Sequence, residues 1–301
     1  MAEIREISVE GCEVIGKGGQ GTIYRLDEET IVKLYQPGYD IEDIDKEREI
    51  AKKALIAGIP TAISFGTVKA GDSYGIIFEM MNSGTLSAAM KKDPENLPKY
   101  VKMYYDMFQE LHQIHDEEGA FPKIKDSLHE QADRMGKWLN ADEIKVLHEL
   151  TDALKDSNTI IHGDFHPGNL MLHNNELLII DVPSIKSGDT IYDLYTVFRD
   201  MISCPKSTPY MCEISQGMSP ELCTQVGQMF FSMHCKSQDP QVIGEYLQKL
   251  GLVYSFFLTL FLGEENLHPE AEKKAPSIID GAFKGAVLPN VDALKMLLAN
   301  M

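Results

Sequence analysis

The chain has 301 residues, of which 44% are hydrophobic and 25% are charged, so it can bury a large core and is long enough for two lobes. Its net charge is −18, which argues against a protein that binds nucleic acid or an anionic membrane, because both require a basic protein surface. The start of the chain lacks the basic and apolar segments of a signal peptide, and the longest apolar stretch (250–262) is too short to span a bilayer. The five cysteines are scattered, which is typical of reduced thiols. We therefore expect a cytoplasmic protein with no membrane partner.

Short strands joined by turns are predicted at the start of the chain, over residues 9–35. A helix is predicted over residues 41–57. It is expected to end there because a glycine follows directly and a proline lies two residues further on. Two more strands are predicted over residues 63–68 and 74–78. Together these elements make a small antiparallel sheet with one helix, which we expect to form a first lobe of residues 1–81.

The remaining residues, 82–301, have a mainly helical pattern and are expected to form a second, larger lobe. Amphipathic helices fit residues 98–116 and 141–155. A strand at residues 159–161 leads into the most polar motif of the chain. Two short apolar runs, joined by polar residues, then predict a hairpin over residues 170–180. The fold class expected from these elements is α+β.

A glycine-rich run, Gly16-Lys17-Gly18-Gly19-Gln20-Gly21, lies between two of the predicted strands. Such a strand–turn–strand loop can fold over phosphates, because backbone N–H groups approach where side chains would clash. The dinucleotide-binding version instead opens a helix after one strand. Taken alone, the run is equally consistent with an ordinary glycine-rich turn.

Lys33, on the next predicted strand, could neutralise phosphate charge, although an exposed strand lysine is the simpler alternative. Glu47 of the predicted helix has apolar residues three, four and seven positions later and therefore faces inward. Glu49 instead has lysines three and four positions later and faces solvent. An inward glutamate needs a cation to offset its burial, so we expect Glu47 to pair with Lys33.

The strongest local signal is His162-Gly163-Asp164-Phe165-His166-Pro167-Gly168-Asn169, followed by the predicted hairpin and then by Asp181. Asp181 leaves an apolar strand and Asn169 offers an amide oxygen, and Mg²⁺ prefers such hard oxygen donors together with phosphates. Asp164 is then free to orient and deprotonate a hydroxyl nucleophile. These residues could simply form turns. Their spacing, after the glycine run, the lysine and the glutamate, favours phosphoryl transfer.

In this order, the motifs resemble the protein-kinase-like signature set. The catalytic-loop form, His162-Gly163-Asp164 with His166-Pro167-Gly168-Asn169, resembles the aminoglycoside phosphotransferase and choline-kinase-like branch. Segments at 58–64 and 71–75 resemble a bacterial paralogous group of phosphotransferases within that branch, one with no acceptor assigned. The resemblance covers residues 10–200 and implies a bilobal protein-kinase-like fold.

The resemblance implies a nucleotide site for ATP in the first lobe, made by Gly16, Gly18, Gly19, Gly21, Ile23, Lys33, Glu47, Glu79 and Met81. The glycines would cover the phosphates, and Ile23 would lie against the adenine. Lys33 would contact the α- and β-phosphates while paired with Glu47. Backbone groups of Glu79 and Met81 would hold the adenine edge.

The same resemblance implies roles around the catalytic loop. Asp164 would be the catalytic base, and Asn169 and Asp181 would bind Mg²⁺. His162 would support the loop by packing and hydrogen bonding. Asp193 resembles a helix aspartate that braces the loop, with a surface helix residue as the alternative.

Departures from protein kinases point to a small acceptor. Asp181-Val182-Pro183 stands in place of Asp-Phe-Gly, and Gly163 stands where regulated kinases have arginine. Eleven residues separate Asp181 from Asp193, too few for a long activation segment. We therefore expect an ATP- and Mg²⁺-dependent phosphotransferase acting on a hydroxyl of an aminoglycoside-, choline- or sugar-like molecule. The alternatives are an atypical protein Ser/Thr kinase and a catalytically silent nucleotide-binding protein.

No motif identifies the acceptor, whose site is expected among residues 92–158 and 200–301. The negative net charge is compatible with a cationic small molecule. Glu264, Glu265 and Glu270 could contact a cation, with a solvated acidic turn as the alternative.

Overall fold

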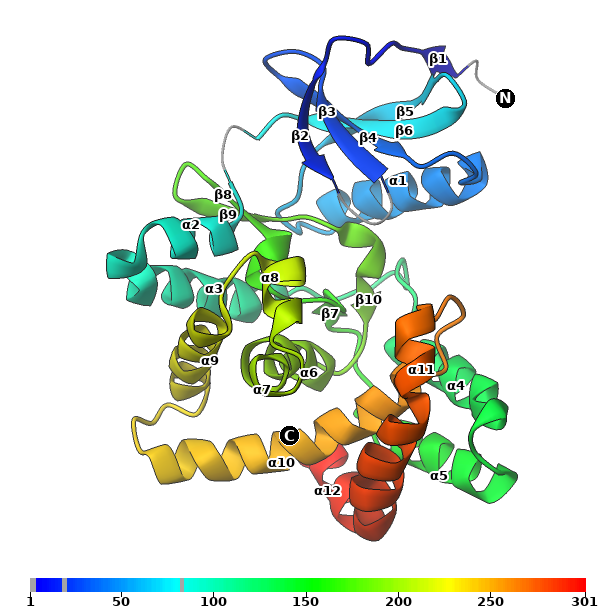
Figure 1. Ribbon diagram of the computed structural model, residues 1–301, viewed down its shortest axis with the longest axis vertical. Helices are drawn as coiled ribbons and strands as arrows, with labels where there is room; N and C mark the ends of the chain where they lie inside the picture. Colours follow the sequence, from blue (N-terminus) through cyan, green and yellow to red (C-terminus); the bar gives the residue numbers. More distant parts are fainter. Residues whose placement is uncertain (1–3, 18–20, 82–83) are drawn as a thin grey trace. The chain divides into compact units, whose positions relative to one another are not determined.

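The computed structural model of the chain describes residues 4–17, 21–81 and 84–301 (Figure 1). It divides into two compact units. Unit 1 comprises Met1–Ala89 and Pro167–Ser184, and unit 2 comprises Met90–His166 and Ile185–Met301. The chain therefore passes from unit 2 into unit 1 within the predicted catalytic loop, between His166 and Pro167.

Unit 1 is built on a six-stranded sheet of order β1-β5-β6-β4-β3-β2. Its strands are β1 (Arg5–Glu6), β2 (Glu13–Lys17), β3 (Gly21–Arg25), β4 (Thr30–Tyr35), β5 (Ser64–Ala70) and β6 (Ser73–Glu79). All neighbours pair antiparallel except β1, which runs parallel to β5. The sheet is therefore mixed, whereas the sequence predicted an antiparallel one, because the two-residue strand β1 has no sequence signal of its own.

One helix, α1 (Ile41–Ile56), packs against β5 and β6 of this sheet (Figure 1). It begins where the Asp40 carboxylate accepts a hydrogen bond from a first-turn N–H, and it ends just before Gly58, whose φ is +84°. Adjacent strand residues point to opposite faces. Ile76 accordingly packs with Ile44 of α1, whereas Ile77 packs in a separate apolar cluster.

The hairpin β8 (Leu170–His173) and β9 (Glu176–Ile179) completes unit 1. Its turn residues Asn174 and Asn175 have φ of 51° and 64°, the left-handed conformation that a two-residue hairpin turn requires and that asparagine tolerates. The Ile179 N–H donates to the Pro60 carbonyl at 2.7 Å, which ties the hairpin to the segment after α1. The predicted hairpin is confirmed.

Unit 2 is mainly helical, as the sequence predicted. Its helices are α3 (Leu97–Leu111), α4 (Ile124–Asp133), α5 (Ala141–Asp152), α6 (Ile191–Phe198), α7 (Cys204–Ser207), α8 (Tyr210–Gln216), α9 (Pro220–His234), α10 (Pro240–Phe261), α11 (Pro269–Ile278) and α12 (Val291–Asn300), and α2 (Leu86–Lys92) joins the two units. Two short strands, β7 (Ile160–Ile161) and β10 (Lys186–Ser187), pair antiparallel. No helix among the described residues is long and apolar enough to cross a membrane.

An aromatic core anchors the predicted catalytic loop inside unit 2. The Phe165 ring stacks on Tyr104 of α3 with ring centres 5.1 Å apart, and the Tyr104 hydroxyl donates to the Phe165 carbonyl at 2.9 Å. Phe108 of α3 and Phe230 of α9 pack around the same pair. Because all four side chains are buried, this cluster holds the loop backbone rigidly against α3 and α9.

Candidate active site

In unit 1, Lys33 of β4 and Glu47 of α1 form an ion pair, with Nζ 2.8 Å from Oε1. Their side chains are 20% and 12% exposed, so the pair is largely shielded from solvent. Glu49 pairs instead with Arg48 at 3.2 Å on the exposed face of the helix. The pairing expected from the sequence is therefore present, and the role of these two residues toward a nucleotide remains a prediction.

The glycine run is only partly described. Gly16 lies in β2 and Gly21 begins β3, whereas Gly18 and Gly19 fall outside the described residues. A Cβ atom on Gly21 would overlap the carbonyl oxygen of Leu34 in β4, so a glycine is needed there for the close approach of two strands, whatever the loop binds. A Cβ on Gly16 would make an ordinary contact of 3.4 Å with Ile23.

The predicted adenine-binding segment begins at the last residue of β6. The backbone N–H of Glu79 donates to the Ile63 carbonyl at 3.0 Å, and its carboxylate accepts from the Ile63 N–H at 2.9 Å. These two bonds fix the end of the strand. Met81 comes two residues later and is partly exposed. Both residues thus lie where the central strand leaves the sheet.

Asn169 and Asp181 flank the open end of the hairpin. The Ile180 N–H donates to the Asn169 carbonyl at 2.9 Å, continuing the hairpin ladder by one rung beyond β8 and β9 and bringing Asn169 beside the residue that precedes Asp181. Asp181 is exposed and has φ of +60°, a left-handed conformation that aspartate adopts more readily than most residues. An amide oxygen and a carboxylate oxygen on neighbouring rungs form a hard donor set that fits Mg²⁺.

Asp181 and Glu47 both lie within electrostatic range of Tyr35. Burial raises the pKa of Tyr35 well above its usual value, and the negative charges of Glu47 and Asp181 add to that rise. The Lys33 ammonium in turn lies over the Tyr35 ring, 4.9 Å from its centre. One ammonium therefore contacts the Tyr35 ring, and two carboxylates of unit 1 act on its hydroxyl electrostatically.

In unit 2, Asp193 of α6 holds the start of the predicted catalytic loop. Its carboxylate is fully buried and accepts hydrogen bonds from the backbone N–H groups of His162 and Gly163, both at 2.8 Å, and lies 2.9 Å from Nε2 of His112. Gly163 has φ of +82°, which explains a glycine at this position. The His162 ring is buried and accepts from the Asp164 N–H at 3.2 Å.

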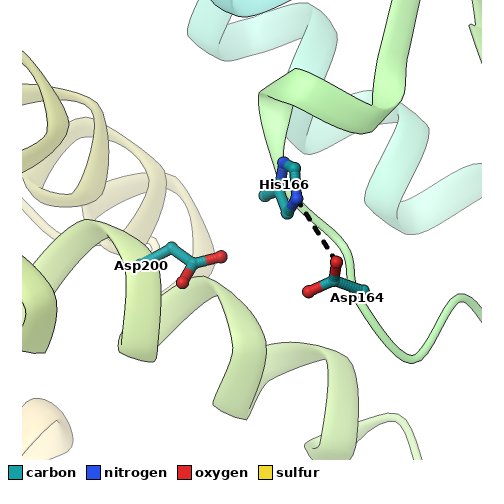
Figure 2. A group of neighbouring side chains, drawn as sticks. All are labelled: Asp164, His166 and Asp200. Atoms are coloured by element: carbon teal, nitrogen blue, oxygen red, sulfur yellow. Dashed lines mark ion pairs between the residues drawn. The ribbon is translucent and has the colours of Figure 1, made fainter. Parts of the chain in front are cut away.

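The Asp164 side chain is 35% exposed and lies in a group of charged residues. His166 Nε2 is 3.4 Å from one carboxylate oxygen, and Arg199 Nη2 donates to the other at 2.5 Å. Arg199 also donates from Nε and Nη2 to Asp200 at 2.7 and 2.9 Å. Figure 2 shows Asp164 and His166 on the loop, with Asp200 facing them from the helix opposite.

These contacts settle the charge state of Asp164. Partial burial favours the neutral acid, but the hydrogen bond from His166 and the positive charge of Arg199 outweigh burial and hold the pKa of Asp164 well below its usual value. Asp164 is therefore an ionised hydrogen-bond acceptor throughout the physiological pH range. Ligand atoms of Asp164, His166 and Asp200 lie within 4.8 Å of one another, but the Arg199 guanidinium already supplies the positive charge there.

Arg199 and Asp200 were not predicted from the sequence. They follow α6 directly, at the start of a π-helical segment, η5 (Arg199–Ser203). Asp193, Thr196 and Asp200 are spaced at i, i+3 and i+7 and so share one helix face, and Thr196 Oγ1 accepts from the Phe165 N–H at 3.1 Å. The signal was available: this polar stripe interrupts a helix that is otherwise apolar.

Known proteins resemble this chain in sequence and structure. A protein-family sequence model described as "Phosphotransferase enzyme family" (APH) matches residues 11–210 of this chain. A thermostable mutant of aminoglycoside phosphotransferase APH(4)-Ia, in ternary complex with AMP-PNP and hygromycin B, has a TM-score of 0.57 at 12% identity, over 97% of this chain and 95% of that one. ADP-bound aminoglycoside phosphotransferase APH(2'')-Ib has a TM-score of 0.55 at 16% identity, over 90% and 93%.

A choline/ethanolamine kinase family protein from Mesorhizobium loti has a TM-score of 0.52 at 12% identity, over 96% of this chain and 92% of that one. No curated protein matches the chain. At such low identity the structural likeness establishes the fold: an α+β, kinase-like arrangement of a mixed sheet with one helix followed by a mainly helical part.

Proposed function

Because the chain belongs to the phosphotransferase enzyme family (APH), we propose that it transfers the γ-phosphate of ATP to a hydroxyl group of a small molecule. The observation that carries this proposal is the state of Asp164. Its carboxylate is ionised, partly open to solvent, and held on a loop whose backbone Asp193 fixes by two hydrogen bonds. A fixed, ionised acceptor is what a hydroxyl nucleophile needs for orientation.

Residues of unit 1 would hold the nucleotide. Lys33, kept in place by Glu47, would contact the α- and β-phosphates, and the glycine run would cover them. Asn169 and Asp181 would hold Mg²⁺, which when bound neutralises charge on the phosphates. Ile23 would pack on the adenine, and the Glu79–Met81 segment would hold its edge.

Asp164 would act on the acceptor. The acceptor hydroxyl would donate a hydrogen bond to the carboxylate and so be aimed at the γ-phosphorus. As the new bond from the hydroxyl oxygen to phosphorus forms, the bond from phosphorus to the bridging oxygen breaks and ADP leaves. The hydroxyl proton passes to Asp164 and then to solvent. The low pKa of Asp164 makes it a weak base, so its main contribution would be orientation, which suits a transition state with late proton transfer.

The acceptor is proposed to carry a cationic group. A hollow of about 240 Å³ in unit 2 is lined by Trp138, Glu264, Glu265 and Glu272 together with Arg134 and Lys137. Burial raises the pKa of Glu264, the positive charges of Arg199, Lys186 and Arg134 oppose that rise, and the negative charge of Asp164 adds to it, so these charges lie within electrostatic range. Among the described residues Glu264 has no ion-pair partner, whereas Glu272 pairs with Lys137. An amine of the acceptor would supply a direct ion-pair partner for Glu264.

A comparison of acceptors tests this assignment. Glu264→Gln should raise KM for amine-bearing acceptors several-fold while leaving KM for neutral sugars and the rate of acceptor-free ATP hydrolysis unchanged. Glu265→Gln, in the same hollow, is the matched control. Equal KM values for amine acceptors in the wild type and Glu264→Gln would contradict a role for Glu264.

Nucleotide binding is tested separately by thermal unfolding with Mg·ATP. Ligand binding to the folded state raises the unfolding temperature, so the wild type should be stabilised by Mg·ATP and Asp181→Ala should lose most of that stabilisation. Asp156→Ala, which removes an aspartate that is 93% exposed, is the control and should respond like the wild type. An unchanged response in Asp181→Ala would remove it from the metal site.

A further inference from the structure

A second group of titratable side chains lies outside the proposed active site, where α4 packs against α5. His129 of α4 and His148 of α5 face each other with their Nδ1 atoms 2.7 Å apart. The ring centres are 5.0 Å apart and the ring planes differ by 18°. This separation is little more than the N···N distance plus the two ring radii, so the Nδ1 atoms point directly at each other.

The opposite edge of each ring is held by a carboxylate. His129 Nε2 is 3.2 Å from Oδ1 of Asp152, and His148 Nε2 is 3.1 Å from Oδ1 of Asp133. Each helix thus supplies one histidine and, four residues later, the aspartate that holds the histidine of the other helix. A carboxylate accepts hydrogen bonds, so both Nε2 atoms carry the proton and both Nδ1 atoms carry lone pairs in the neutral rings.

Two lone pairs that face each other at 2.7 Å repel, and only a cation between them makes the contact favourable. A proton or a metal ion can fill that position. We propose that His129 and His148 form a site for a divalent transition-metal ion of the zinc or copper class, bound through the two Nδ1 atoms.

The chemistry of the neighbours fits such an ion. In protein metal sites, a ligating histidine usually donates its other ring N–H to a carboxylate, which fixes the tautomer and strengthens the ligand, and Asp133 and Asp152 occupy that position here. Imidazole nitrogens favour zinc, copper and nickel, whereas Mg²⁺ and Ca²⁺ favour oxygen donors. The site would therefore discriminate against the ion expected with ATP.

The geometry requires a small adjustment. Tetrahedral zinc with ordinary Zn–N bonds separates two nitrogens by about 3.3 Å, so the rings would have to move apart by about 0.6 Å. The histidine side chains are 31% and 29% exposed, which leaves room for water to complete the coordination. Two protein ligands make this a modest site whose ion would link α4 to α5.

The surrounding charges add to the attraction. Asp133 and Asp152 bring two negative charges next to two rings that are neutral when they ligate a metal. Lys125, the lysine of α4, pairs with Asp156 at 2.7 Å, and Lys295 of α12 and Lys145 of α5 pair with Glu149 at 2.8 and 3.9 Å. These three lysines pair with other carboxylates, and the group of His129, His148, Asp133 and Asp152 keeps a net negative charge when its rings are neutral.

Zinc titration against a chromophoric chelator tests the proposal on the full chain. The wild type should bind one equivalent of Zn²⁺ more than either His129→Ala or His148→Ala, whereas His173→Ala, which alters a hairpin histidine, should match the wild type. Asp133→Asn and Asp152→Asn should each weaken this equivalent by about 10- to 100-fold. Equal zinc stoichiometry in the wild type and the two alanine variants would overturn the proposal and leave a shared proton between the rings.

A readout on the wild type keeps the test independent of whether the variants fold. Nitrogen-15 spectra of labelled histidines report which ring nitrogen is protonated and which binds metal. Zn²⁺ should shift the Nδ1 resonances of two histidines that carry the proton on Nε2, and the same concentration of Mg²⁺ should leave them in place. Zinc-induced shifts confined to other histidines would contradict the assignment.

Discussion

The guanidinium of Arg199 donates from a single nitrogen, Nη2, to Asp164 at 2.5 Å and to Asp200 at 2.9 Å. One cation is therefore shared between the proposed catalytic carboxylate, which is partly exposed, and a second carboxylate that is buried. The arrangement orients Asp164 and keeps its carboxylate ionised.

Replacing Arg199 with alanine should move the acid limb of the pH–kcat/KM profile to higher pH. Without the guanidinium, burial and the charge of Asp200 both favour the protonated form of Asp164, so the pKa of Asp164 rises. Arg199→Lys keeps a charge but loses the planar fork and should give a smaller shift. An acid limb at the same pH in the wild type and Arg199→Ala would show that Arg199 does not control the ionisation of Asp164.

The same ionisation should appear in stability. The pKa of Asp164 is lower in the folded chain than its ordinary value of 3.8, so ionisation of Asp164 stabilises the fold above that pH and the contribution is lost as the pH falls below it. The difference in unfolding free energy between the wild type and Asp164→Asn should therefore stay almost constant down to about pH 4.5 and narrow as the pH is lowered further, towards about 2.5. Urea unfolding at a series of pH values measures it, and a gap that widens on acidification would contradict the assigned direction.

Asp193→Asn should destabilise the chain by about 2 to 4 kcal/mol, because an amide offers one acceptor oxygen where the carboxylate serves two backbone N–H groups and His112. At least one buried N–H would lose its partner. Urea unfolding gives the free energy, and kcat should fall together with it because the loop that carries Asp164 loses its support. An exposed aspartate variant such as Asp156→Asn should change neither, and a stability loss below about 0.5 kcal/mol for Asp193→Asn would contradict the bracing role.

Glu47→Gln should reduce the stabilisation of the chain by Mg·ATP, because Lys33 would lose the carboxylate that holds its ammonium in place. Glu49 lies two residues further along α1, on the exposed face of the helix. Glu49→Gln is therefore a matched control that should respond like the wild type. Thermal unfolding with and without Mg·ATP measures both. If Glu47→Gln and Glu49→Gln lost the same amount of stabilisation by Mg·ATP, the Lys33–Glu47 ion pair would have no role in nucleotide binding.

Gly21→Ala should destabilise the fold by about 1 to 3 kcal/mol, since a new methyl group would overlap the Leu34 carbonyl and force β3 away from β4. Gly16→Ala meets only an ordinary contact with Ile23 and should change stability little. If the glycine run covers phosphates, Gly16→Ala should instead weaken the ATP response. Denaturant unfolding separates the two effects, and a Gly21→Ala variant as stable as the wild type would contradict the close-approach explanation.

Strong local signals predicted the elements that position the site. The hairpin of β8 and β9 was predictable because two asparagines between apolar runs suit a turn with positive φ. The inward position of Glu47 followed from helical periodicity, and the ion pair with Lys33 followed from the cost of burying a charge. Strand β1 was not predictable, because it has two exposed residues and its pairing with β5 is a tertiary contact.

The group around Asp164 was harder to predict. Arg199 lies 35 residues further along the chain and reaches Asp164 because α6 folds back under the loop. Periodicity could have placed Asp193, Thr196 and Asp200 on one helix face, but it could not say which loop that face contacts. The pairing of His129 with His148 likewise depends on how α4 packs on α5, which neither helix sequence specifies by itself.

Acceptor-dependent phosphoryl transfer at Asp164 is tested by coupled ADP release, measured over a panel of aminoglycosides, amino alcohols and sugars. We expect at least one acceptor to raise ADP release above the acceptor-free rate, and Asp164→Asn to lower that increment by about 10²- to 10⁴-fold. Equal rates of acceptor-dependent ADP release in the wild type and Asp164→Asn would contradict phosphoryl transfer at Asp164. So would a rate of ADP release that no acceptor raises although ATP binds normally.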